Sequence, residues 1–321
     1  MSSHPAKELW SAWAPLPGWS PTADVLAETL DGGQSFGWTS VTAPTSGAGM
    51  ETGSHPIWTG RWLSHVVQLR LAAGVLQWRG LPGTTVTEVR HYLGHETDWP
   101  ALIDSLPWRS DAHLARCLAA YPGLRILRQP FGETLLGFLC SATKQIVQIK
   151  QMLALLAERH GQPIGRAASP FAAASAGSGV PALPFKRLPT WTELAKAPEA
   201  ELRACLLGFR ARYISETAKF LARHPGWLEE TEHAPYAAAK AHLLELPGVG
   251  EKVADCVLLF GADRLEAFPV DTWMLKSLAR RYGLTGWKPA PVAHFGRTHF
   301  GPLAGLAQQY LFAWERRHGG R

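Results

Sequence analysis

The sequence predicts an α+β protein, with an antiparallel β-sheet domain at residues 21–125 and a mainly α-helical domain at residues 126–321. Two patterns predict this order. Apolar residues alternate with polar residues in 67–71 and 76–79, which is the period of a half-buried strand. From about residue 126 onward, apolar residues recur every three or four positions, which is the period of a helix.

The first half of the chain is expected to contain a tail, a hairpin and a long loop. Residues 1–20 are rich in Ser, Pro and Trp, which predicts a loose tail whose tryptophans can dock. The small residues of 72–74 separate the two alternating runs and predict a β-hairpin. Thr, Ser, Gly, Ala and Pro dominate 42–56, which predicts a flexible loop inserted in the sheet.

The second half is expected to form two helical lobes. Helical spacing first dominates 135–156, and the proline-rich stretch 162–189 then interrupts it as a connection between the lobes. Further helices are expected at 191–207, 213–222, 236–244, 252–260, 271–282 and 303–316.

A tight turn is predicted between the helices at 236–244 and 252–260. Gly248 and Gly250 permit positive φ, and Pro247 presets its own φ for a turn. The backbone N–H groups of such a turn, beside a helix N-terminus, can bind an anion. We therefore expect a phosphate-binding helix-hairpin-helix unit at residues 236–262.

Lys252 and Asp271 are the candidate catalytic residues. Lys252 falls in the first turn of its helix, where the helix dipole favours the free amine, a nucleophile for Schiff-base chemistry. Asp271 precedes another helix as an expected N-cap, from which its carboxylate could oppose a developing positive charge. Taken singly, such a lysine is usually a surface group and such an aspartate only a cap. Their order behind the hairpin favours cleavage of a glycosidic bond in DNA.

Composition restricts the other function classes. The net charge of +6 and pI near 9.2 suit a DNA partner, although many basic proteins do not bind nucleic acid. Four cysteines without close spacing predict reduced thiols and no metal site. Neither an apolar run of about 18 residues nor a signal-peptide core occurs, so we expect an intracellular protein without a membrane segment.

The segment from Leu246 to Asp271 resembles the helix-hairpin-helix DNA glycosylase superfamily, with its hairpin, nucleophilic lysine and Pro-Val-Asp motif. Four further segments narrow the resemblance to the 8-oxoguanine DNA glycosylase branch. These are GQSF at 33–36, RQPFGETLLGFLCSATKQI at 128–146, GFRARY at 208–213 and GLAQ followed by a phenylalanine at 305–312. The resemblance runs from about residue 31 to 312 and places the glycosylase domain at 126–321.

This resemblance implies a bifunctional base-excision repair enzyme. Lys252 would displace the oxidised base from a flipped nucleotide and form an imine with the sugar, while Asp271 stabilises the oxocarbenium-like transition state. β-Elimination would then nick the strand. The implied partner is double-stranded DNA containing oxidised guanine, and we expect a monomer without a cofactor in the bacterial nucleoid or a nucleus. Superfamily members with an iron–sulfur cluster have four close cysteines after the Pro-Val-Asp helix, which this chain lacks.

The resemblance also assigns base-binding residues. Gly33 would present its carbonyl to the extra N–H of 8-oxoguanine, Gln308 would bond the base edge, and Phe312 and Cys256 would pack on the two faces of the base. The structural alternatives are a strand-end turn for Gly33, a surface amide for Gln308 and core packing for Phe312 and Cys256.

The remaining DNA contacts depart in part from the family pattern. Phe209 matches the aromatic wedge and Arg210 the reader of the opposite cytosine, the alternative being an apolar helix end followed by a surface arginine. Thr143 and Gln148 stand where related animal and fungal enzymes have asparagine and arginine at the orphaned cytosine, which predicts relaxed opposite-base selectivity. Trp273 replaces a histidine near the lesion.

Two other functions compete with this interpretation. A monofunctional glycosylase for alkylated purines shares the fold and suits a chain with 14 tryptophans, but such enzymes generally lack the lysine. A non-catalytic DNA-binding helix-hairpin-helix module would not need the Lys252 and Asp271 pair.

Overall fold

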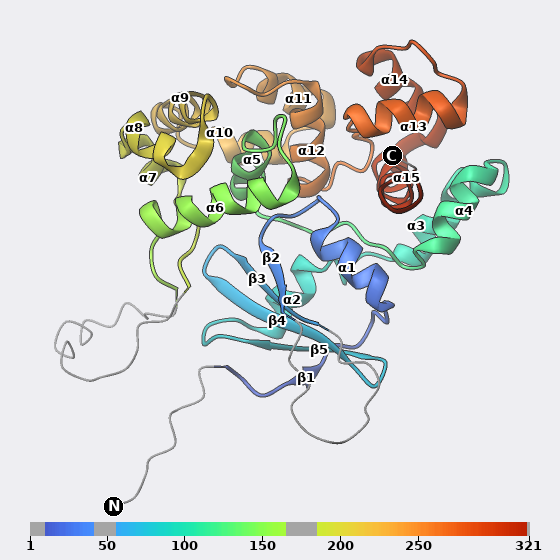
Figure 1. Cartoon of the computed structure of the whole chain (residues 1–321), viewed down its shortest axis with the longest axis horizontal. Coiled ribbons are helices and arrows are strands. Elements are labelled where there is room, and N and C mark those ends of the chain that lie inside the picture. Colours follow the sequence, from blue (N-terminus) through green and yellow to red (C-terminus); the bar gives the residue numbers. More distant parts are fainter. Residues whose placement is uncertain (1–9, 42–55, 165–184, 320–321) are drawn as a thin grey trace, which may run out of the picture.

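A computed structural model describes residues 10–41, 56–164 and 185–319. The predicted order of a sheet domain followed by a helical domain is confirmed, and Figure 1 shows the sheet below a broad layer of helices. The predicted loop at 42–56, apart from its last residue, and the middle of the predicted connection lie outside the described residues.

The sheet has five antiparallel strands in the order β1-β5-β4-β3-β2. The strands are β1 (Ala14–Pro15), β2 (Trp38–Val41), β3 (Ile57–Trp62), β4 (His65–Ala72) and β5 (Val75–Gly80). The predicted hairpin is formed by β4 and β5, with Leu69 opposite Trp78. Alternate side chains of these strands are buried because one face of the sheet packs on the core.

The expectation of a loose N-terminal tail is wrong for residues 10–20. Here β1 pairs with the edge strand β5, and Arg70 stacks on Trp13 at 4.1 Å from its ring centroid. Trp19 is buried and donates its indole N–H to the carbonyl of Gly123 at 3.0 Å. The docking expected of the tryptophans is confirmed for these two.

Residues 21–125 also contain helices that the sequence analysis did not predict. They are α1 (Ala23–Asp31), α2 (Val86–Tyr92), α3 (Trp99–Ser105), the short η1 (Pro107–Arg109) and α4 (Ala112–Ala120). Each α-helix begins at a Thr or Asp cap whose side-chain oxygen accepts a backbone N–H of the first turn. These helices have only two or three turns, so the helical spacing of their apolar residues is short and is easily masked by the strand-like alternation nearby.

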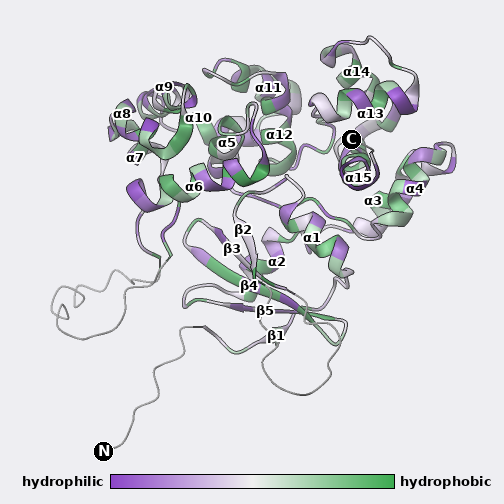
Figure 2. Cartoon of the chain, viewed as in Figure 1, coloured by the Kyte–Doolittle hydropathy of each residue, from purple (hydrophilic) through white to green (hydrophobic). Residues whose placement is uncertain are grey.

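The helical domain begins at α5. Its elements are α5 (Phe131–Leu139), α6 (Ile146–His160), α7 (Trp191–Lys196), α8 (Glu199–Leu202), η3 (Arg203–Leu207), α9 (Arg210–Arg223), α10 (Trp227–His233), α11 (Tyr236–Leu244), α12 (Glu251–Gly261), α13 (Thr272–Tyr282), α14 (Pro289–Phe300), η4 (Gly301–Leu303) and α15 (Ala304–His318). The apolar stretches of α5 and α12 lie at its centre (Figure 2), where Phe138 stacks on Phe260 with ring centroids 5.5 Å apart.

Three expectations about these helices are corrected. The helix expected at 191–207 is divided, because Ala197 is extended before Pro198. Next, α9 begins at Arg210, three positions earlier than expected. Finally, α10 and α14 were not predicted; α10 begins after the left-handed Gly226 and α14 begins with a proline at its first position.

The helices form two groups, as expected, but the expectation that 162–189 connects them is wrong, because α6 packs on η3 and α5 on α9, which lie on the two sides of that stretch and in the same group. In one, α5 packs on α12, and α12 on α11. In the other, α15 packs on α13, α14 and α4, so a helix from the first half of the chain completes this lobe (Figure 1). The segment between α12 and α13, which carries Phe268 in the core, joins the two groups.

Candidate active site

The turn between α11 and α12 has the predicted hairpin form. Gly248 has φ +80°, and a Cβ atom there would lie 2.4 Å from Cδ2 of Tyr213. Only glycine fits this conformation and this close approach. Gly250 is extended, with φ −102°, and no side chain caps the first turn of α12. The N–H groups at this helix terminus are therefore available to an anion.

Lys252 lies in the first turn of α12, as predicted, and is partly buried. Its Nζ atom lies 5.0 Å from the ring centroid of Phe138, on α5. A second aromatic ring, Phe36 of the GQSF segment, meets Phe138 edge to face at 5.2 Å. The amine is thus placed against an aromatic wall that joins the sheet domain to the helical domain.

The carboxylates that flank Lys252 along the chain are paired with another cation. Lys240, on α11, lies 2.7 Å from Glu251 and 2.9 Å from the buried Asp255. Tyr236 also donates its hydroxyl to Asp255 at 2.7 Å. Burial lowers the pKa of Lys240, but the two carboxylates outweigh it and raise that pKa above its ordinary value. Sequence reasoning missed this cluster, which joins the two helices of the hairpin unit.

Asp271 caps α13, as predicted. Its Oδ1 atom accepts the backbone N–H of Met274 at 2.8 Å. Cys256, one turn beyond Lys252, is buried, and burial raises the pKa of its thiol to about 11. Lys252 lowers that pKa and Asp271 raises it, so both charges act at one thiol. The structure therefore places the predicted amine at the start of α12 and the predicted carboxylate at the start of α13, both within electrostatic range of the Cys256 thiol.

Gly33 lies beside Phe312 and Ile146. A Cβ atom on Gly33 would lie 3.3 Å from Cδ1 of Ile146 and 3.7 Å from Cε1 of Phe312. The φ of +104° at Gly33 favours glycine. Gln308 is buried and donates to the carbonyl of Pro269 at 3.3 Å, so its alternative interpretation as a surface amide is wrong.

Gln34 fixes the segment that carries Gly33. Its amide donates to the carbonyl of Arg125 at 2.9 Å and accepts the N–H of Leu127 at 2.8 Å. Gln129 donates its side-chain amide to the Gln34 carbonyl at 2.6 Å. The sequence analysis named Gln34 only as part of the GQSF motif and missed this role. A single glutamine gives no sign in the sequence that it will be buried and bonded to distant residues.

Phe209 is exposed on a rigid support. Half of its surface (51%) is accessible, its ring meets Tyr213 edge to face at 5.8 Å, and the Arg210 guanidinium lies 4.3 Å from the ring centroid. The same Tyr213 packs under Gly248. The hairpin and the candidate wedge are therefore in contact through one tyrosine.

Arg210 is 2% exposed, which contradicts its alternative interpretation as a surface arginine. Its guanidinium donates to the carbonyls of Leu207 and Ala142 and, at 3.1 Å, to the hydroxyl of Thr143. Contact with a cytosine would require exchange of these bonds. The structure thus joins two of the predicted DNA-binding residues, Arg210 and Thr143, in one contact.

The other two predicted DNA contacts are on exposed helix starts. Gln148 accepts the backbone N–H of Gln145 at 3.2 Å and so closes the capping box of α6. Trp273, in the first turn of α13, is about half exposed.

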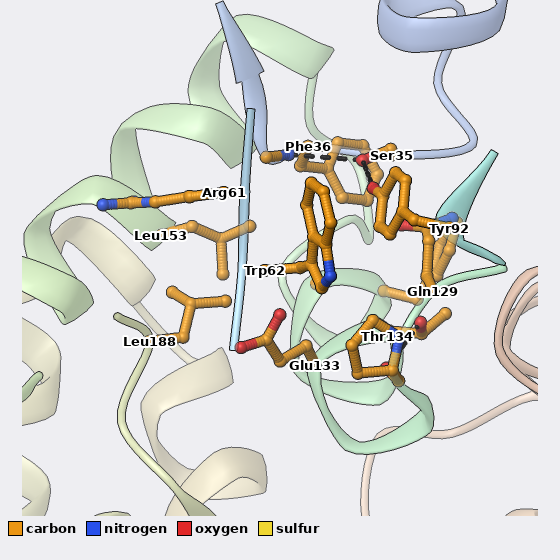
Figure 3. Close-up of a pocket in the computed structure, with 14 residues that line it drawn as sticks. Ser35, Phe36, Arg61, Trp62, Tyr92, Gln129, Glu133, Thr134, Leu153 and Leu188 are labelled. Atoms are coloured by element: carbon orange, nitrogen blue, oxygen red, sulfur yellow. Dashed lines mark hydrogen bonds between the residues drawn. The ribbon is translucent and has the colours of Figure 1, made fainter. Parts of the chain in front are cut away.

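A cavity of about 40 Å³ lies behind the aromatic wall, between the GQSF segment and α5 (Figure 3). Glu133 is on its edge and accepts the N–H of Leu63 at 3.0 Å. Burial raises the pKa of Glu133 to about 7, against the effects of that N–H and of Arg61 and Arg187. Sequence reasoning did not identify this carboxyl group, which ties the β3–β4 turn to α5.

The described ranges contain neither a cluster of His, Cys, Asp and Glu that could hold a metal ion nor a helix long and apolar enough to cross a membrane. All four cysteines are unpaired and buried.

Two family models match adjoining parts of the chain. Residues 21–135 match the 8-oxoguanine DNA glycosylase N-terminal domain, and residues 137–295 match the HhH-GPD superfamily base excision DNA repair protein. Together they extend from α1 into α14.

Named relatives and a solved structure are similar to the chain. A probable N-glycosylase/DNA lyase of Methanothermobacter thermautotrophicus is 40% identical over 37% of this chain and 38% of the relative. The N-glycosylase/DNA lyase OGG1 of Arabidopsis thaliana is 34% identical over 60% of this chain and 52% of the relative. The chain thus spans about half, or less, of these curated relatives. The Clostridium acetobutylicum 8-oxoguanine glycosylase/lyase, solved with dsDNA containing cytosine opposite 8-oxoG, is 27% identical, with 92% of each chain covered and a TM-score of 0.77.

Proposed function

Because this chain belongs to the HhH-GPD superfamily of base excision DNA repair proteins, we propose that it excises 8-oxoguanine from duplex DNA and nicks the strand. The observation that carries the proposal is the placement of Lys252 in the first turn of α12 and of Asp271 at the N-cap of α13, with the buried Cys256 thiol close enough to respond to both charges. A DNA-binding module without catalysis would not need an amine and a carboxylate there. Lys252 also disfavours a monofunctional glycosylase for alkylated purines.

Binding would begin at the hairpin. A DNA phosphate would accept the N–H groups at the start of α12, where Gly250 leaves the approach open. Phe209 would enter the base stack while the damaged nucleotide leaves the duplex. Tyr213 supports both the wedge and the hairpin, so the wedge would be held in register with the bound phosphate.

The pocket for the flipped base would lie between Gly33 and α15. The Gly33 carbonyl would accept the N–H that distinguishes 8-oxoguanine from guanine, and Gln308 would bond the base edge. Phe312 and Cys256 would contact opposite faces of the base. The hydrogen bonds of Gln34 would keep the Gly33 carbonyl in place, since they fix the next residue to the segment 125–129.

Lys252 would then attack the anomeric carbon, and the bond from that carbon to the base would break. Asp271 would stabilise the positive charge that develops on the sugar. Loss of a proton from the amine and opening of the sugar ring would give an imine, which permits β-elimination of the 3′ phosphate. Water would then hydrolyse the imine and free the Lys252 amine. The products would be the free base and a nicked strand whose 3′ end carries an unsaturated aldehyde.

We infer relaxed selectivity for the base opposite the lesion. Thr143 and Gln148 replace the asparagine and arginine of the related pattern, and Thr143 is engaged with Arg210. The acting species would be a monomer without a cofactor, in the nucleoid or nucleus where genomic DNA lies.

A strand-cleavage assay tests this function. A labelled duplex with 8-oxoguanine opposite each of the four bases would be incubated with the protein and with Lys252→Gln. The proposal predicts nicked product from the wild type alone. Abasic product without a nick would indicate a monofunctional glycosylase, and intact DNA would contradict the lesion or the enzyme assignment.

A further inference from the structure

The turn between α8 and α9 exposes a leucine in an unfavourable backbone conformation. Leu206, within η3, has φ +62° and ψ +16°, and 54% of its surface is accessible. A residue with a Cβ atom is disfavoured in this left-handed region, which glycine adopts freely. A large apolar side chain that is both strained and exposed gains little from folding.

The rest of the turn is firmly held. Cys205 and Leu207, on either side of Leu206, are fully buried. Arg203 donates to the Gly208 carbonyl at 3.2 Å, and Arg210 donates to the Leu207 carbonyl at 3.3 Å. These contacts keep the backbone in place on both sides, so the leucine side chain is presented from a rigid turn.

A second exposed apolar side chain, Phe209, follows three positions later in the same turn. The intervening Gly208 has open space around it, since no atom would lie within 4 Å of a Cβ there. Two exposed apolar side chains therefore flank an open glycine. Apolar side chains that partly unstack bases are a common means of deforming duplex DNA.

We propose that Leu206 is a second wedge, which enters the base stack beside Phe209 and helps to fill the space that the flipped nucleotide leaves. The inference rests on the proposed function and adds a DNA-contacting residue to it. Its occupant is the stacked duplex, because Leu206 is exposed in the same turn as Phe209, the residue assigned to that duplex.

Leu206→Gly separates this role from folding, since it removes the side chain and relieves the strain together. A matched control is Leu63→Gly. Leu63 also has positive φ, +47°, and is 50% exposed, but it is in the two-residue turn between β3 and β4, which requires that conformation. Both variants should melt at or above the wild-type temperature.

The experiment compares base release from two duplexes, one with 8-oxoguanine opposite cytosine and one with it opposite an abasic analogue. Separation of a base pair is needed only in the first. We expect Leu206→Gly to act at least tenfold more slowly on the first duplex and within threefold of the wild type on the second. Leu206→Met and Leu63→Gly should match the wild type on both.

Three results would overturn the inference. If Leu206→Gly released the base from the paired duplex as fast as the wild type, Leu206 would not be a wedge, and the proposed function would still stand. An equal loss on both duplexes would show a general distortion of the site. A wild type that releases base from neither duplex would overturn the proposed function and the wedge with it.

Discussion

One added methyl group should destabilise the protein at Gly248 but leave its stability unchanged at Gly250. In Gly248→Ala, φ +80° costs about 1–2 kcal/mol for a residue with a Cβ atom. The new atom also lies 2.4 Å from Cδ2 and 2.6 Å from Cγ of Tyr213, and such overpacking costs about 1–3 kcal/mol. The free energy of unfolding should therefore fall by about 2–5 kcal/mol in total.

Gly250→Ala is the control, because its backbone is extended and nothing lies within 4 Å of the new Cβ. Its stability should stay within about 0.5 kcal/mol of the wild type. Urea denaturation of both variants gives these values, and titration of labelled duplex should show weaker DNA binding by Gly250→Ala, since its methyl group occupies the phosphate approach. Equal stability of the two variants would refute the close contact between hairpin and Tyr213.

Three further predictions concern the interior. Burial raises the pKa of Glu133 to about 7 from its ordinary value of 4.5, so the folded protein loses stability as the pH rises between these values. In urea denaturation, the free energy of unfolding of Glu133→Gln should exceed that of the wild type by up to about 3 kcal/mol at pH 8 and equal it at pH 4. Gly33→Ala should excise base at least about tenfold more slowly in a single-turnover assay, because φ +104° strains a residue with a Cβ atom and that atom would press on Ile146 at 3.3 Å, which would displace the Gly33 carbonyl. Lys240→Met should lower the free energy of unfolding by about 3–5 kcal/mol, because it leaves Asp255 buried without its cation. In a double-mutant cycle, adding Asp255→Asn to that variant should restore part of the lost stability.

Features set by neighbouring residues could be predicted from the sequence. The hairpin at Gly248 and the cap at Asp271 both formed where expected, because glycine, proline and capping side chains act within a few positions. The hairpin of β4 and β5 is likewise encoded by alternation along one short stretch.

Features set by distant partners could not be predicted. Gln34 bonds residues more than 90 positions away, and the burial of Arg210 depends on the turn at Ala142 and Thr143. The strain at Leu206 likewise has no signal in composition, since the segment has good helical residues on both sides. These contacts arise only when the two lobes and the sheet have assembled.

In the proposed mechanism, Lys252 forms a covalent bond with the sugar of the damaged nucleotide. Borohydride added during the reaction with an 8-oxoguanine duplex would reduce the imine to a stable adduct, whose position mass spectrometry can identify. We predict an adduct on Lys252 that is absent from Lys252→Gln. An adduct on another lysine, or strand nicking without any adduct, would contradict the mechanism.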